Sequence, residues 1–116
     1  MPEYIIDKAI PKQVQALQKR GGNFQIASRT VAEIIGKMRL GVDDPLKGIK
    51  ITNHGESRIK HCVKYDLSGY VRLITIQDNN VFTLKFLGTH EECDSWLDAN
   101  KGPSGFEPKT YRLECY

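Results

Sequence analysis

The sequence lacks several features that mark whole classes of protein. No stretch of its 116 residues holds the roughly 18 consecutive apolar residues of a membrane-spanning helix, so no membrane association is expected. The first residues have neither the basic nor the apolar region of a secretory signal. The three cysteines, Cys62, Cys93 and Cys115, are an odd number without regular spacing, which is typical of free thiols in a reducing compartment. We therefore expect a cytoplasmic protein.

Motifs of the common enzyme classes are also missing. There is no phosphate-binding loop, no dinucleotide-binding glycine pattern and no serine-nucleophile turn. His61 beside Cys62, and His90 three residues before Cys93, supply metal-binding side chains, but their spacing matches no zinc pattern. We expect neither a metal ion nor another cofactor.

The net charge of +3 is too small to indicate nucleic-acid binding, but the charges are unevenly distributed. Between Lys47 and Arg72 there are six lysines and arginines and two acidic residues. Between Gly88 and Asn100 there are four acidic residues and no lysine or arginine. A chain polarised in this way can carry a basic patch without being basic overall. The alternative is a solvated face of mixed charge.

Three helices are predicted. The first begins near Pro11, which suits a first helical turn, and ends at the glycine pair 21–22. The second carries apolar residues at positions 31, 34, 35 and 38, one stripe at helical period, with Ser28 or Thr30 as its N-cap. The third opens at Thr89-His90-Glu91-Glu92, a capping box, and closes at residues 101–103.

Short strands account for most of the remaining chain. We expect them at residues 3–7, 58–66, 70–77 and 81–87, with a brief extended piece at 49–52 and turns at 68–69 and 78–80. The order β-α-α-β-β-β-α predicts an α+β fold. Two helices would cover one face of a small, mainly antiparallel sheet and leave the other face open, with a C-terminal helix following. Residues 1–103 would form one domain and residues 104–116 a tail.

The strand at 58–66 alternates in a way that predicts a basic face. Its residues Ile59, His61, Val63 and Tyr65 would face the helices, while Arg58, Lys60 and Lys64 would emerge on the opposite side, joined by Arg72 from the next strand. Long cations at fixed positions suit phosphate recognition. Lys47 and Lys50 would extend this surface, and the aromatic rings available to stack on unpaired bases are those of Tyr65, Tyr70 and Trp96. The alternative is a strand whose lysines serve solubility or protect a sheet edge.

His90 is the second candidate for chemistry. It is predicted at the junction of the last strand and the last helix, where the helix dipole and its acidic neighbours Glu91 and Glu92 act on it in opposite directions. A histidine that titrates near neutrality can act as a general acid or base. The alternative is a structural or surface histidine.

Three segments together resemble a known family. They are Gly-Tyr-Val-Arg-Leu-Ile at 69–74, the run Val81–Leu87, and Gly-Thr-His-Glu-Glu-Cys-Asp at 88–94. They look like the C-terminal half of toxins of the RelE/ParE superfamily, and the last segment is similar to the HigB branch. The resemblance in element order covers residues 3–100, and the motif match is confined to 69–98.

The resemblance implies an endoribonuclease that cuts mRNA, commonly on the ribosome, and that a cognate antitoxin protein holds in check. By position, Arg72 matches the arginine of the family's Tyr-Arg-Leu strand and His90 the histidine of its Gly-Thr-His motif. Lys60 and Lys64 fall on the strand that usually supplies catalytic lysines. Val71 separates Tyr70 from Arg72, which would move one side chain to the other face unless a bulge absorbs it.

We expect this protein to cleave mRNA by metal-independent attack of a ribose 2′-OH, with Arg72, His90, Lys60 and Lys64 as catalytic residues. Arg58, Lys47, Lys50, Tyr65, Tyr70 and Trp96 would bind RNA. Two alternatives share the fold: a ParE-like inhibitor of DNA gyrase without nuclease activity, and an inactive RelE-fold binding module.

Overall fold

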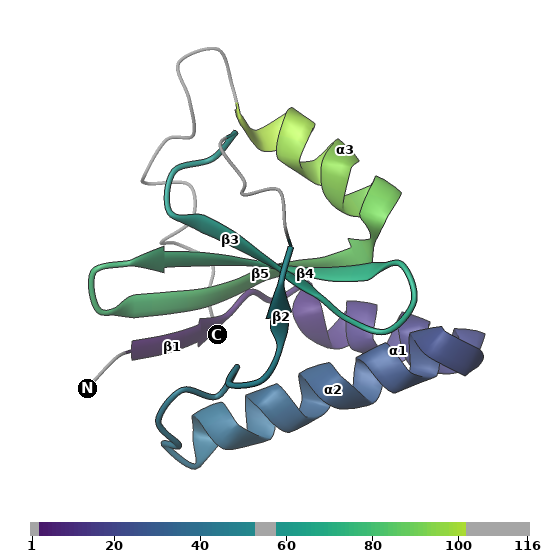
Figure 1. Cartoon of the computed structure of the whole chain (residues 1–116), viewed down its shortest axis with the longest axis horizontal. Helices are drawn as coiled ribbons and strands as arrows, with labels where there is room; N and C mark the ends of the chain where they lie inside the picture. The colour runs from purple at the N-terminus through teal and green to yellow at the C-terminus, as the bar shows by residue number, and fades with distance from the viewer. Residues whose placement is uncertain (1–2, 53–57, 102–116) are drawn as a thin grey trace.

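The computed structural model describes residues 3–52 and 58–101 (Figure 1). Eight elements follow one another in the order β-α-α-β-β-β-β-α. They are β1 (Glu3–Ile6), α1 (Ile10–Arg20), α2 (Gly22–Arg39), β2 (Lys50–Ile51), β3 (Cys62–Asp66), β4 (Val71–Asp78), β5 (Val81–Thr89) and α3 (His90–Lys101). None of the helices in these ranges is long and apolar enough to cross a membrane. The predicted tail, residues 104–116 with Cys115, lies outside the described residues.

The strands form one mixed sheet in the order β1-β5-β4-β3-β2. β1 pairs with β5 in parallel, and the other pairs are antiparallel. Helices α1 and α2 pack side by side on one face of the sheet, and α3 lies on the other (Figure 1). The α+β prediction is confirmed. The expectation of an open second face is wrong, because α3 folds back over it.

The larger hydrophobic core lies between the sheet and the pair α1–α2. Its helix residues repeat at helical period, as the sequence pattern predicts, and the largest buried members are Ile10, Leu17, Val31, Ile34 and Met38. Strand residues on the facing side complete it, among them Val71, Leu73, Leu84 and Leu87.

Helix α2 begins at Gly22, six to eight residues before the predicted caps. Gly21 has a φ of 72°, which lets the chain end α1 and start α2 with no linker between them. Ser28 and Thr30 are therefore inside the helix, and their hydroxyls donate back to the carbonyls of Gln25 and Ile26. The prediction of an N-cap at either residue is wrong.

A second, smaller core lies under α3. It joins Cys93 and Leu97 of the helix to Ile74 and Ile76 of β4, with Ile59 beside them. The predicted capping box is confirmed: the Thr89 N–H donates to Glu92 Oε1 at 2.8 Å, and the Glu92 N–H donates to Thr89 Oγ1 at 3.2 Å. This cap starts α3 at the sheet edge and directs it across the face.

Strand β3 is shorter than predicted because its alternation fails at His61. That residue has a φ of 64°, which breaks the extended backbone. Ile59 consequently packs under α3, and His61 is exposed beside Asp78. The prediction that Ile59 and His61 face α1 and α2 is wrong. Val63 does pack against that core, where Tyr65 is buried, so the predicted face holds only from Cys62 onward.

Candidate functional site

Arg72 lies where the family resemblance places the functional arginine, on the α3 face of β4. It pairs with Asp66 across the β3–β4 ladder, and Arg72 Nε lies 2.8 Å from Asp66 Oδ1. Thr52 Oγ1 donates to the same carboxylate oxygen at 2.8 Å, which fixes the acid in place. The Arg72 Nη1 donates to the carbonyl of Val71 at 3.1 Å, and the side chain as a whole is 17% exposed.

Val71 does not displace Arg72 from this face. Tyr70 lies in the turn before β4, so the strand begins at Val71, in the core, and Arg72 points to the opposite side. The ladder irregularity comes later, between Ile74 and Thr75, where β5 carries Lys85 as an extra residue. The bulge turns Lys85 toward β1, where its Nζ lies 3.1 Å from Asp7 Oδ2.

Lys64 is two residues from Asp66 on the same side of β3. It is almost fully covered, with 7% exposure. The positive charge of Lys64 acts on Cys93 in α3. Burial raises the pKa of the Cys93 thiol to about 12, and the charges of Lys64 and Arg72 both act to lower it. Lys64 and Arg72 therefore lie close together under the first turns of α3.

His90 is the first residue of α3. Its N–H donates to the carbonyl of Tyr70 at 2.6 Å, which ties the start of the helix to the start of β4. One turn later Asp94 lies 3.3 Å from His90 Nε2. Arg58 holds the same acid from the other side at 3.0 Å, and this hydrogen bond lowers the pKa of Asp94 below its ordinary value, with the charges of His90 and Lys64 acting in the same direction.

Three of the four predicted catalytic residues thus lie on neighbouring segments. Lys64 lies opposite Ile74 on β4, two residues from Arg72, and the His90 N–H donates to the carbonyl of Tyr70, two residues before Arg72. Lys60 is exposed in the loop before β3. Within the described ranges no three histidine, cysteine or acidic side chains gather as a metal site would require. These neighbouring segments therefore carry a cluster of cations and carboxylates.

The predicted RNA-binding residues are spread more widely. Lys47 and Lys50 are exposed around β2, and Tyr70 is exposed next to His90. Trp96 stacks on Phe86 with ring centroids 5.6 Å apart, on the far side of α3. Tyr65 is 7% exposed in the α1–α2 core, and its hydroxyl accepts from Gln77, so its ring has no open face for a base.

The basic segment 47–72 contacts the acidic segment 88–100 through Arg58. Arg58 donates to the side chains of Asp94 and Asp98 on α3, at 3.0 and 3.1 Å. Because α3 brings its acids onto the lysine- and arginine-rich strands, the expected open basic face is replaced by an ion-paired one.

Sequence reasoning missed the two acids that organise the site. Asp94 was detectable, because it is four residues after His90 in a predicted helix and therefore on the same side of that helix. Asp66 was not, because its position opposite Arg72 depends on the register of β3 against β4.

The fold occurs in a known toxin. The structure of a copper-bound mutant toxin from Helicobacter pylori superimposes with a TM-score of 0.53, covering 79% of this chain and 98% of that chain at 20% sequence identity. No protein-family model and no curated protein sequence matches the chain. This likeness establishes a shared fold.

Proposed function

We propose that this protein is the toxin of a toxin–antitoxin pair and that it cleaves mRNA, on the ribosome, in the cytoplasm. The observation that carries the proposal is that Lys64, Arg72 and His90 lie on neighbouring segments. Lys64 is opposite Ile74 on β4, two residues from Arg72, and the His90 N–H is bonded to the Tyr70 carbonyl just before β4. Two cations and an imidazole at one place are what cleavage of a phosphodiester by its own ribose requires. The resemblance of segments 69–74 and 88–94 to HigB-like toxins, and the fold shared with a bacterial toxin, support it.

The proposed reaction is transesterification. The ribose 2′-oxygen attacks the adjacent phosphorus, the bond from phosphorus to the 5′-oxygen breaks, and the products are a 2′,3′-cyclic phosphate and a free 5′-hydroxyl. The 2′-OH loses its proton and the departing 5′-oxygen gains one; His90 makes one of these two transfers and water makes the other. Arg72 and Lys64 stabilise the negative charge that develops on the phosphoryl oxygens.

Substrate binding must then change the partners of Arg72. Asp66 occupies one side of the guanidinium in the free protein, at 2.8 Å from Nε. An RNA phosphate can take the remaining donors of the same fork while Asp66 keeps it oriented, since a guanidinium has five donors. Asp66 and Asp94 are in this scheme positioning residues for Arg72 and His90.

The same ion pairs favour a second candidate, an inactive binding module. Arg72 faces Asp66, Arg58 faces two acids, and His90 faces Asp94, so each of these three has a carboxylate partner in the free protein. A surface neutralised in this way suits a structural role for the charges as well as a catalytic one.

The test is cleavage mapping in a reconstituted translation reaction. Purified protein is added to translating ribosomes and to naked mRNA, and the new 5′ ends are located by primer extension. Arg72→Ala is the test variant. Arg39→Ala is its control, because that exposed arginine lies at the C-terminal end of α2, outside the segments that carry Lys64, Arg72 and His90. Circular dichroism and thermal unfolding establish that both variants are folded.

Cuts that need ribosomes and Arg72, and that survive Arg39→Ala, would support the ribosome-dependent nuclease. Cuts on naked mRNA would support the nuclease activity and reject its dependence on the ribosome. No cuts from folded wild-type protein would reject the nuclease and leave a binding protein. Retained cleavage by folded Arg72→Ala would reject the role given to Arg72.

A further inference from the structure

A cleft opens beside His90, between the first residues of α3 and the junction of α1 and α2. It has a volume of about 480 Å³, within the range of small-molecule sites. Three places in the sequence line it: Arg20 and Phe24 around the α1–α2 junction, Tyr70 in the turn before β4, and Thr89–Glu91 at the start of α3. No motif in the sequence brings these segments together.

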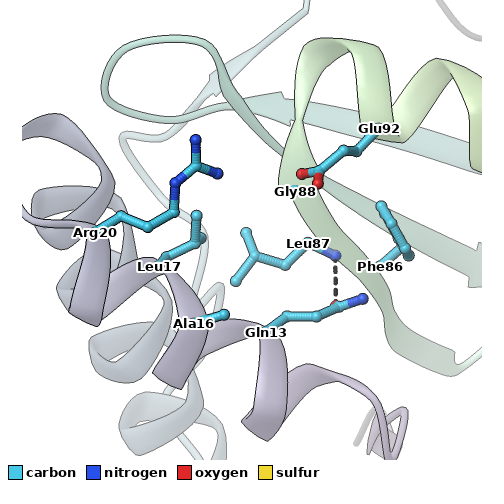
Figure 2. A pocket seen from close by; sticks show the side chains of 8 residues that line it. All are labelled: Gln13, Ala16, Leu17, Arg20, Phe86, Leu87, Gly88 and Glu92. Carbon is cyan, nitrogen blue, oxygen red and sulfur yellow. Dashed lines mark hydrogen bonds between the residues drawn. The ribbon is translucent and has the colours of Figure 1, made fainter.

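A smaller pocket of about 130 Å³ lies behind Arg20, between α1 and β5 (Figure 2). The Leu87 N–H donates to Gln13 Oε1 at 2.9 Å, which closes the strand edge there. Figure 2 shows the Arg20 side chain rising from α1 beside Leu17, with its guanidinium at the upper margin of this pocket. Arg20 therefore lines both hollows and separates the small one from the large cleft.

The Tyr70 backbone is anchored from two sides. Ser68 Oγ lies 3.0 Å from Asn23 Oδ1, and Gly69, with a φ of 68°, packs so closely on Asn23 that an added Cβ would be 3.0 Å from that residue's Cβ. On the other side the Tyr70 carbonyl accepts from His90. The side chain itself is 78% exposed, so a fixed backbone presents a free aromatic ring.

Thr89 and His90 in the lining of the cleft are bound to Glu92 and Asp94, but three other polar side chains, Arg20, Tyr70 and Glu91, have no polar partner among the described residues. The Arg20 Cζ lies over the Phe24 ring, 3.8 Å from its centroid, a cation–π contact that uses none of the guanidinium N–H groups as hydrogen-bond donors. Within the described ranges, Arg20 and Glu91 make no ion pair and the Tyr70 hydroxyl makes no hydrogen bond. The cleft thus offers one stacking ring, one fork of donors and one carboxylate acceptor.

We propose that this cleft binds a single unpaired guanine base of the RNA, from the nucleotide next to the phosphate held at Arg72. The inference rests on the proposed function and names the base that the site selects. Tyr70 would stack on the base. Arg20 would donate to guanine O6 and N7, and Glu91 would accept from the N–H groups on the opposite edge.

The donor set distinguishes guanine from the other bases. Adenine has an amino group, a donor, at the position of guanine O6, so the Arg20 N–H groups would meet another donor instead of an acceptor. Cytosine and uracil have no N7 and cannot take the bidentate contact. A buried or stacked donor left without a partner costs free energy, which is the physical basis of the discrimination.

The first experiment measures binding alone. The four ribonucleoside 3′-monophosphates are titrated separately into ¹⁵N-labelled protein and followed by two-dimensional NMR. Guanosine monophosphate should bind about tenfold more tightly than the others and shift the amides of Tyr70 and Thr89–Glu91. Tyr70→Ala and Arg20→Gln should each weaken that binding about tenfold, and Arg39→Gln, which removes the same charge elsewhere, should not. Equal binding of all four, or shifts confined to other surfaces, would overturn the inference.

The second experiment separates this inference from the proposed function. If the protein cuts mRNA, guanosine should be enriched beside the cuts. Arg20→Gln should lower cutting beside guanosine relative to cutting beside the other nucleotides, and Arg39→Gln should leave that ratio unchanged. Cutting with no base preference in the wild type would overturn the guanine site and leave the nuclease. Selective guanosine monophosphate binding by a protein that cuts nothing would leave the guanine site and reject the nuclease.

Discussion

Asp66 lies directly opposite Arg72 in the β3–β4 ladder, with its Oδ1 at 2.8 Å from Arg72 Nε. The N–H of that nitrogen does not point along this line, so the contact is an ion pair without a hydrogen bond. The carboxylate is held by Thr52 and does not depend on the arginine for its position. The guanidinium is therefore neutralised by Asp66, and its Nη1 also donates to the carbonyl of Val71 at 3.1 Å, so the side chain is held in place from two sides.

Replacing Asp66 by asparagine should strengthen RNA binding. The substitution removes the negative charge beside Arg72 and leaves an amide oxygen that can still accept from the Thr52 hydroxyl. One further uncompensated cation should steepen the dependence of log affinity on log salt by about 0.7 for single-stranded RNA. The measurement is the affinity for a single-stranded RNA at several salt concentrations.

Asp78→Asn is the control for that variant. It also removes one negative charge, but Asp78 lies on β4 beside His61 and not beside Arg72. An equal gain in affinity from both variants would mean that net charge, and not the release of Arg72, is responsible. No gain from Asp66→Asn would contradict the role given to the Asp66–Arg72 pair.

The fold was largely predictable because it follows from local patterns. The apolar stripe of α2, the capping box of α3 and the hydrophobic run of β5 each specify an element within a few residues. The start of α2 was not predictable in the same way, because Gly21 joins two helices directly and the polar residues Ser28 and Thr30 mimic caps. The break at His61 has no local marker, since a positive φ at that residue type is uncommon.

The site was predictable only in part, and for a different reason. Lys64 and Arg72 were predicted from the strand pattern, which holds after Cys62, and His90 from its position at the start of the last helix; the family resemblance then matched Arg72 and His90 by position. The acids that pair with them, and the cleft at Arg20 and Tyr70, depend on how α1, β3 and α3 pack against one another. The sequence does contain one signal for the packing of α3. Its acidic segment 88–100 and the basic segment 47–72 carry opposite charges, which favours contact between them.

Asp94 should make the stability of the protein sensitive to acid. The hydrogen bond from Arg58 lowers its pKa below the ordinary 3.8, so the carboxylate stabilises the folded state at any pH above that value. That stabilisation is lost as the pH falls below 3.8 and then through the lower pKa that Asp94 has in the folded protein. Because the Asp94 side chain is 40% exposed, the contribution should be modest, about 0.2–1 kcal/mol.

The measurement is the free energy of unfolding of wild type and Asp94→Asn between neutral pH and the acid limit. The wild type should be more stable at neutral pH, and the difference should shrink below about pH 4, where an ordinary aspartate takes up its proton. High salt should reduce it as well. A difference that is constant with pH would show that the Asp94 charge contributes nothing.

Cys93 should destabilise the fold at alkaline pH. Burial raises its pKa from 9.0 to about 12, so above pH 9.0 the unfolded chain loses the thiol proton while the folded protein keeps it. The free energy of unfolding should then fall with a slope of up to about 1.4 kcal/mol per pH unit. Subtracting the profile of Cys93→Ala, measured by urea unfolding, removes the contribution of lysines and tyrosines. An identical slope in both proteins would contradict the assignment, and so would rapid alkylation of Cys93 in the folded protein at about pH 8, where an ordinary free thiol reacts.

Removing one partner of the buried pair Asp7–Lys85 should cost more stability than removing one partner of any ion pair on α3. Lys85 Nζ lies 3.1 Å from Asp7 Oδ2, and the two side chains are 7% and 13% exposed, in the order Lys85 and Asp7. Asp7 also accepts from the Ala9 N–H through its other oxygen, so it connects the end of β1 to the start of α1. Lys85→Met leaves this carboxylate buried without its cation and should cost about 3–5 kcal/mol in the free energy of unfolding.

The double variant Asp7→Asn/Lys85→Met provides the matched control for this pair. It removes both charges and keeps an oxygen for the Ala9 N–H, so it should recover most of the stability lost in Lys85→Met alone. Chemical denaturation of the wild type, the two single variants and the double variant gives the coupling energy directly. A double variant no more stable than Lys85→Met would mean that the lysine stabilises the bulge by packing its methylene chain, and not by pairing with Asp7.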